Sequence, residues 1–136
     1  MKILFLDDCP YRWKKFKDVN PEADADWAPS FDEGVRLIKE NNYDMAYLDH
    51  DLDFYAPTGK DFVDYIVNHK IAISKLVCHS MNYSGRHSMT SALYDNHYHA
   101  INCPFAWKSK VEDIVHEMDI VAIAVKNGDI PLYPNS

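Results

Sequence analysis

Three short apolar runs in this chain stop abruptly at polar clusters, and this pattern limits the folds that the chain can adopt. The runs cover residues 2–6, 44–48 and 75–78, and acids, histidine or serine follow each at once. A continuous apolar run of this length is typical of a strand buried on both faces of a parallel sheet. Between the runs, apolar residues recur at helical spacing. The alternation predicts an α/β fold.

Helix starts are marked by local signals. Pro10 opens the first helix, Ser30 and Glu33 form a capping box before the second, and Thr58 and Ser84 are expected to cap the third and fourth. The remaining elements are a weak second strand at 26–28, a fifth strand at 98–102 and a last helix from about 109 to 126. The chain therefore alternates five strands with five helices.

This order predicts a flavodoxin-like three-layer sandwich whose parallel strands lie in the order 2-1-3-4-5. We expect one domain over residues 1–136, with 127–136 as a C-terminal tail. Ligands of such folds bind outside the carboxyl ends of neighbouring strands. The residues that reach this edge after the first, third and fourth strands are Asp7, Asp8, Asp49, His50, Asp51, His79 and Ser80.

Composition narrows the class of partner. The chain has 136 residues, 47% of them hydrophobic, which suits a single core, and its formal net charge of −7 disfavours binding to long nucleic acid. A small nucleotide or an RNA end remains compatible with that charge. No apolar run reaches the ~18 residues of a membrane span, and the odd cysteine count indicates reduced thiols. We expect a cytoplasmic protein that does not bind membranes, with its oligomeric state left open.

The acids at the predicted edge point to a cation. Asp7, Asp8, Asp49 and Asp51 would repel one another in one crevice, and a divalent metal is the simplest relief. Oxygen ligands suit Mg²⁺, Mn²⁺ or Ca²⁺, and a histidine ligand would admit Zn²⁺. We predict Asp7, Asp8 and Asp49 as the metal ligands, with Mg²⁺ or Mn²⁺ as the metal. Alternatively, one or two of these acids cap helices.

His50 and His79 follow neighbouring strands and could lie a few ångströms apart. Two histidines beside a phosphate can act as general base and general acid near neutral pH, with Asp49 and Asp51 beside them. A structural role is the alternative for each histidine. Four other histidines lack acidic neighbours at this edge and are interpreted as surface or packing residues: His69, His97, His99 and His116.

Two helix starts could present phosphate-binding groups to the same edge. Thr58 and Gly59 open the third helix, and the run 84–86 places Gly85 and Arg86 at the start of the fourth. Each turn is a weak signal alone, because glycine at helix starts is common for conformational reasons. Trp107 and Tyr83 could stack on a base or simply pack at the rim.

The layout resembles the response-regulator receiver domain. In receivers, an acidic pair after the first strand binds Mg²⁺ and an aspartate after the third strand is phosphorylated, which would correspond to Asp7, Asp8 and Asp49. The receiver lysine before the proline after the fifth strand is replaced here by Cys103. Because that lysine helps to bind the acyl phosphate, the resemblance implies a scaffold adapted to a different phosphate chemistry.

More specific motifs are LDHDL, the later TG, and HSMN followed by a glycine and a methionine. They resemble the cyclic-phosphate processing receiver-like family of bacteria and phages. The family positions fall on Asp8, Asp49, His50, Asp51, Thr58, Gly59, His79, Ser80, Asn82, Gly85 and Met89. The resemblance implies action on cyclic phosphates such as 2′,3′-cyclic nucleotides or RNA ends, with Ser80 and Asn82 among the substrate-binding residues.

Three functions are therefore compatible with the sequence. The first is a phosphoesterase that opens a cyclic phosphate by means of the histidines and aspartates at the sheet edge. The second is an inactive receiver-like module that binds a nucleotide or a partner protein. The third is phosphoacceptor signalling through Asp49, which the replacement of the lysine by Cys103 disfavours.

Overall fold

The sheet has the predicted topology. A computed structural model describes residues 1–52 and 57–126, and its five parallel strands lie in the order β2-β1-β3-β4-β5. The strands are β1 (Lys2–Leu6), β2 (Asp24–Ala28), β3 (Met45–Leu48), β4 (Lys75–Cys78) and β5 (Ala100–Asn102). The predicted flavodoxin-like fold class is confirmed. The predicted C-terminal tail, 127–136, lies outside the described residues.

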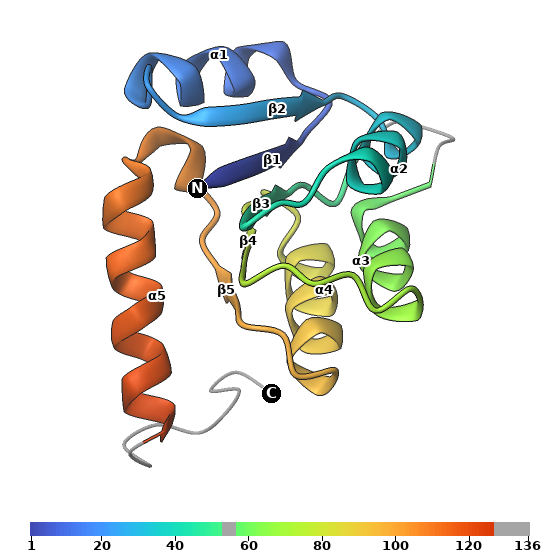
Figure 1. The fold of residues 1–136 in the computed structure, drawn as a ribbon, viewed down its shortest axis with the longest axis vertical. Helices are drawn as coiled ribbons and strands as arrows, with labels where there is room; N and C mark the ends of the chain where they lie inside the picture. The colour runs from blue at the N-terminus through green and yellow to red at the C-terminus, as the bar shows by residue number, and fades with distance from the viewer. Residues whose placement is uncertain (53–56, 127–136) are drawn as a thin grey trace.

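Helices cover both faces of the sheet. Figure 1 shows α2, α3 and α4 on one face and α1 and α5 on the other. Their bounds are α1 (Pro10–Val19), α2 (Phe31–Glu40), α3 (Gly59–Asn68), α4 (Tyr83–Asp95) and α5 (Val111–Lys126), with a short 3₁₀ helix, η1 (Ala106–Lys108), between β5 and α5. Within the described part of the chain, none of the helices has both the length and the apolar character that a membrane span requires.

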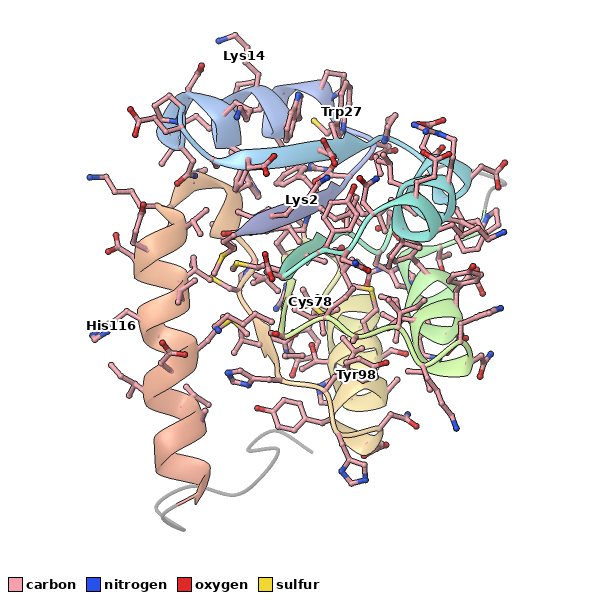
Figure 2. The ribbon with its side chains drawn as sticks, in the orientation of Figure 1. Lys2, Lys14, Trp27, Cys78, Tyr98 and His116 are labelled. Carbon is pink, nitrogen blue, oxygen red and sulfur yellow. The ribbon has the colours of Figure 1, made fainter. Side chains whose placement is uncertain are left out.

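The side chains of each strand alternate between two hydrophobic layers. Leu4 and Leu6 of β1 pack in the layer under α2–α4, whereas Ile3 and Phe5 pack in the layer under α1 and α5. Cys78, labelled in Figure 2, is fully buried in the first layer. Both faces of the strands are therefore apolar, which is why their sequences read as continuous runs.

Several predicted ends of elements are correct and one cap is wrong. The Ser30 side chain accepts a hydrogen bond from the Glu33 N–H, and Thr58 forms a full capping box with Asp61. The fourth helix is capped by Asn82 rather than Ser84, because the Asn82 amide oxygen accepts the Gly85 N–H at 2.9 Å. Asparagine is at least as good an N-cap as serine, and the helix starts earlier as a result.

The last helix begins at Val111, two residues later than expected. Asn20, at the end of α1, accepts the backbone N–H of Val111 at 2.8 Å and donates to the carbonyl of Ser109 at 3.2 Å. A side chain distant in sequence thus caps α5, which no local signal could reveal. The fifth strand is also shorter than predicted and starts at Ala100. All three cysteines are free thiols, as expected.

Candidate functional site

The polar residues that follow β1, β3 and β4 are held by the sheet itself. The backbone N–H of Asp49 donates to the Leu6 carbonyl at 2.9 Å, and the N–H of His79 donates to the Leu48 carbonyl at 3.0 Å. The ladder of hydrogen bonds therefore continues one residue beyond each apolar run. A backbone fixed in this way gives the site a rigid base.

Strand alternation divides the site into two halves. Asp7, Asp49 and His79 each come one residue after a strand and continue the register of the α1/α5 layer, since Phe5 and Tyr47 two residues earlier lie there. The next residue along the chain after Asp49, His50, turns to the opposite face. One half of the site is thus acidic and faces α1, and the other contains His50 and faces α4.

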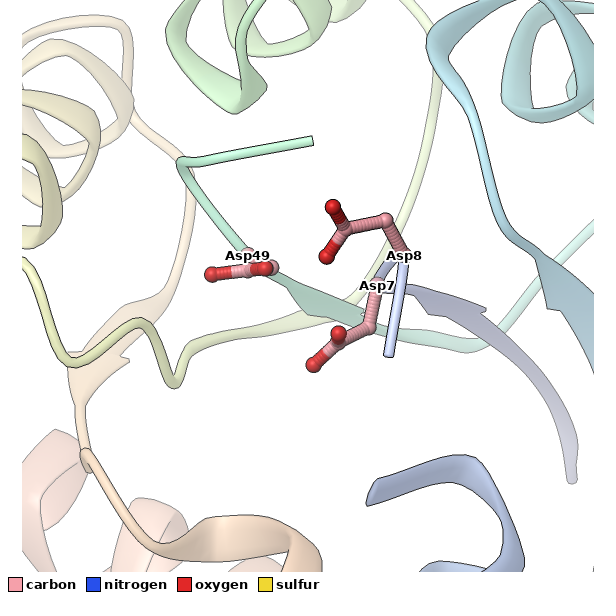
Figure 3. A group of neighbouring side chains, drawn as sticks. All are labelled: Asp7, Asp8 and Asp49. Carbon is pink, nitrogen blue, oxygen red and sulfur yellow. The ribbon is translucent and has the colours of Figure 1, made fainter. Parts of the chain in front are cut away.

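The acidic half is a cluster of three carboxylates, Asp7, Asp8 and Asp49. Figure 3 shows the three side chains converging beyond the ends of β1 and β3, and each offers an oxygen within 4.8 Å of the others. Asp7 and Asp49 are buried, whereas Asp8 is exposed. Burial and the charge of Asp7 raise the pKa of Asp49. The predicted meeting of these acids is observed.

Arg12 of α1 lies among these carboxylates. Its Nε and Nη2 atoms donate to the two carboxylate oxygens of Asp7 at 2.7 and 2.8 Å, and Nη2 also donates to Asp49 at 3.3 Å. The carboxylate of Asp8 is 3.8 Å away. Sequence reasoning missed this arginine, although its spacing of four residues from Asp8 at a helix start was a usable signal.

His79 lies beneath the acidic cluster and is almost entirely buried. Its Nε2 atom is 3.3 Å from an Asp7 oxygen, and its ring meets the edge of the Phe5 ring with centroids 5.0 Å apart. Among the described residues, neither ring nitrogen has a hydrogen bond of good geometry. Burial, which penalises the imidazolium form, lowers the pKa of His79 to about 4. His79 is therefore neutral at pH 7.

This burial predicts a dependence of stability on pH. Between pH 6.5 and about 4 the unfolded chain binds a proton at His79 that the folded chain does not, so acidification through this window favours unfolding. The free energy of unfolding falls between pH 7 and pH 5, and we expect this fall to be about 2 kcal/mol smaller in His79→Gln than in the wild type, as measured by urea denaturation. Asp49 titrates with the opposite sign in both proteins, so the comparison isolates His79. Equal pH dependence in the two proteins would contradict the assignment.

The second half of the site is a group formed by His50, Asp51 and Asn82. His50 Nδ1 is 2.8 Å from an Asp51 carboxylate oxygen, and the Asn82 amide nitrogen is 3.3 Å from the same oxygen. The contact with His50 lowers the pKa of Asp51. With Nδ1 bound to Asp51, the Nε2 atom of His50 is left to act on a ligand. Asp51 joins His50 rather than Asp49, so the loop departs from strand alternation here.

Two glycines allow close packing around His50, because a side chain at either position would clash with His50 or with the Asp49 carbonyl. A Cβ atom on Gly85 would lie 2.3 Å from the His50 ring, so the ring packs directly on the first turn of α4. A Cβ atom on Gly59 would lie 2.0 Å from the Asp49 carbonyl oxygen, and the Gly59 N–H donates to the His50 carbonyl at 2.8 Å. The two glycines predicted to bind phosphate thus also allow the Asp49–His50 backbone and the His50 ring to pack closely against α3 and α4. Asn82 caps α4 and also donates a hydrogen bond to Asp51, so it connects the start of the helix to the His50–Asp51 pair.

Ser80 connects the two halves. Its hydroxyl accepts the Asn82 N–H at 3.1 Å, and Ser80 opposes the upward shift in the pKa of Asp49. Arg86 donates to the Ser80 carbonyl at 2.7 Å and stacks over the exposed Tyr83 ring. Arg86 is therefore close to the site but already has a backbone partner.

Other residues considered from the sequence have structural positions. Trp107 is 6% exposed and packs near Tyr11, so it belongs to the rim and not to a stacking surface. Thr58 caps α3 and contacts Asp61. Figure 2 shows His116 on the outer side of α5, pointing away from the sheet, in agreement with the prediction for the histidines without acidic neighbours.

The donor set of the acidic cluster fits a divalent cation. Three carboxylates within 4.8 Å of one another offer only oxygen, which is what Mg²⁺ and Mn²⁺ prefer. The almost fully buried His79 lies beside Asp7 as a neutral group and adds no charge. Asp7, Asp8 and Asp49 are thus the residues that would hold a metal.

The fold and the acid cluster together define a receiver-type domain. A response-regulator receiver domain from Methanospirillum hungatei has a TM-score of 0.64 at 16% identity, over 90% of this chain and 96% of that one. TrrA from Thermotoga maritima, solved in complex with Mg²⁺ and BeF, has a TM-score of 0.61 at 18% identity, over 90% and 98%. At these identities the likeness establishes the fold alone. No curated protein matches the chain.

A more specific assignment comes from the family comparison. Residues 2–95 match the family described as cyclic-phosphate processing receiver domain, so the chain belongs to that family. A Burkholderia pseudomallei response regulator with a phosphorylated aspartic acid and a calcium ion has a TM-score of 0.66 at 11% identity, over 94% of this chain and 72% of that one. The family match covers both halves of the site.

Proposed function

We propose that this domain is a phosphoesterase that opens a cyclic phosphate ester of a small nucleotide or an RNA end. The observation that supports it most is the position of the group of His50, Asp51 and Asn82 directly beside the acidic cluster. Asp49 and His50 are consecutive, so their Cα atoms are about 3.8 Å apart. The two side chains turn to opposite faces of the sheet, and we propose that the substrate spans the end of β3 so that its phosphate meets both the acidic cluster and the His50 imidazole.

His50 is the proposed general base. Its contact with Asp51 fixes the tautomer in which Nδ1 carries the proton, leaving the Nε2 lone pair for a water molecule. In the hydrolysis, the water oxygen bonds to phosphorus, one proton passes to Nε2 and the ring oxygen that leaves phosphorus takes a proton from solvent. The half-buried Asn82 amide can donate to the charge that develops on the phosphoryl oxygens, whereas the Ser80 side chain is buried.

His79 receives a different role from the one expected. Because it is almost fully buried and neutral at pH 7, it is poorly placed to exchange protons with a substrate. We propose that His79 positions the Asp7 carboxylate from below. Of the two histidines assigned to the site, His50 is then the one that reaches its surface, with a side chain that is 19% exposed.

Asp7, Asp8 and Asp49 are proposed to hold Mg²⁺ or Mn²⁺. Bound there, the ion would supply a Lewis acid that polarises a phosphoryl oxygen and offsets the charge of the phosphate. Without a cation, the acidic half would repel an anionic ester, even though Arg12 neutralises part of its charge.

The function can be tested by turnover of a substrate panel. We would incubate the protein and Mg²⁺ or Mn²⁺ with 2′,3′-cyclic nucleotides, RNA with a 2′,3′-cyclic end, 3′,5′-cyclic nucleotides and linear monoesters, and follow products by ³¹P NMR. Hydrolysis of a cyclic substrate that is lost in Asp49→Asn supports the proposal, since the variant controls for contaminating phosphatases. Tight binding of a cyclic nucleotide that stays intact would instead favour a binding module.

A further inference from the structure

The guanidinium of Arg12 lies among the carboxylates of the acidic cluster. Both carboxylate oxygens of Asp7 accept hydrogen bonds from its guanidinium, at 2.7 and 2.8 Å, and a third bond reaches Asp49 at 3.3 Å. A guanidinium is charged at any pH at which the protein is folded. The cluster therefore has its own counter-ion.

A divalent ion and the guanidinium in its present position compete for the same carboxylates. Arg12 donates to both Asp7 oxygens and to one Asp49 oxygen, and its positive charge would repel an ion held by these acids. The side chain of Arg12 has room to leave, because it is 26% exposed and belongs to the first turn of α1.

We propose that Arg12 is a built-in competitor that the divalent cation must displace, and that the displaced guanidinium then binds the phosphate of the substrate. This inference rests on the proposed function. A guanidinium released next to a bound cation meets a phosphate with the planar fork that fits its oxygens. Binding of cation and of phosphate would thereby be coupled, with the cation first, because Arg12 is bound to Asp7 until the cation arrives.

The first test is the affinity for Mn²⁺ without substrate, measured by calorimetry and by electron paramagnetic resonance of the free ion. We expect Arg12→Gln to bind Mn²⁺ more tightly than the wild type, on the order of tenfold. Arg12→Lys should fall between them, since it keeps the charge but lacks the fork. Unchanged or weaker binding in Arg12→Gln would overturn the proposal, as would the absence of Mn²⁺ binding in both proteins.

A matched control separates competition from general electrostatics. Arg36→Gln changes the net charge by the same amount on the exposed surface of α2, where Arg36 pairs with Glu33 and Glu40. The Mn²⁺ affinity of this variant should equal that of the wild type. An equal rise in Arg36→Gln and Arg12→Gln would overturn the proposal. If Arg12→Gln does not fold without metal, Arg12→Lys is compared with the wild type instead. An unchanged Mn²⁺ affinity in Arg12→Lys would then also overturn the proposal.

The second test measures the affinity for inorganic phosphate with and without saturating Mn²⁺. In the wild type, Mn²⁺ should strengthen phosphate binding, and in Arg12→Gln this gain should be at least severalfold smaller. The same gain in both proteins would overturn the role of Arg12 in anion binding. Neither test involves turnover, so a domain that fails to hydrolyse cyclic phosphates can still confirm or overturn this inference.

Discussion

Replacing His50 with glutamine is expected to lower kcat for hydrolysis of a cyclic phosphate by about 10²- to 10⁴-fold, the range usual for loss of a general base. Glutamine keeps the length and polarity of the side chain but cannot take a proton. The imidazole contributes little to the core, because it packs on Gly85 at the edge of α4 and is partly exposed. The free energy of unfolding should therefore change by about 1 kcal/mol or less.

Steady-state kinetics and urea denaturation on the same preparations provide the measurement. His116→Gln, on the outer side of α5, is the matched control and should alter neither quantity. His79→Gln should shift the pH dependence of stability, as described above, and lower kcat less than His50→Gln does. If His50→Gln retains the wild-type kcat, the assignment of the general base is wrong.

Gly59→Ala is expected to destabilise the fold by about 3 kcal/mol, the largest effect on stability that we expect from a single methyl group in this chain. The added Cβ would lie 2.0 Å from the carbonyl oxygen of Asp49 and 2.9 Å from the Cα atom of His50. Both contacts are with backbone that the sheet fixes, so relief requires moving α3 away from the end of β3. Activity should fall as well, because the segment that moves contains Asp49 and His50.

Gly34→Ala is the matched control for this variant. Its Cβ would meet a ring carbon of Phe62 at 2.8 Å and a methyl carbon of Leu6 at 3.1 Å, and these are side-chain atoms. Alanine also favours a helix over glycine by about 1 kcal/mol, which offsets part of the cost. Urea denaturation should therefore show a clearly smaller loss in Gly34→Ala. Equal losses in the two variants would mean that the backbone after β3 yields more readily than its hydrogen bonds indicate.

Much of the fold could be predicted because the sequence signals are local. Each apolar run marked a buried strand, and the positions of Pro10, Ser30 and Thr58 marked helix starts correctly. The strand order followed from the alternation of elements, since few topologies place parallel strands beside one another with helices on both faces. The cap of α5 by Asn20 could not be predicted, because it joins residues about ninety positions apart.

The candidate site was predicted in location and only partly in arrangement. The end of each strand gave the right acids, but the sequence could not tell that Arg12 turns back into them from α1. Strand alternation, applied to His79, would have placed its side chain in the apolar layer of α1 and α5. The grouping of Asp51 with His50 depends on the loop after β3, where alternation no longer holds.

Every residue to which we assign a part in the site lies between Asp7 and Arg86, whereas β5, η1 and α5 come later in the chain. Among the described residues, β5, η1 and α5 contribute no residue to the site that we assign, and Val111 and Met118 pack in the hydrophobic layer that also contains Phe5 and Tyr47. Substitutions on the outer surface of α5 should therefore leave the geometry of the proposed site unchanged, so this surface can vary in evolution independently of the site.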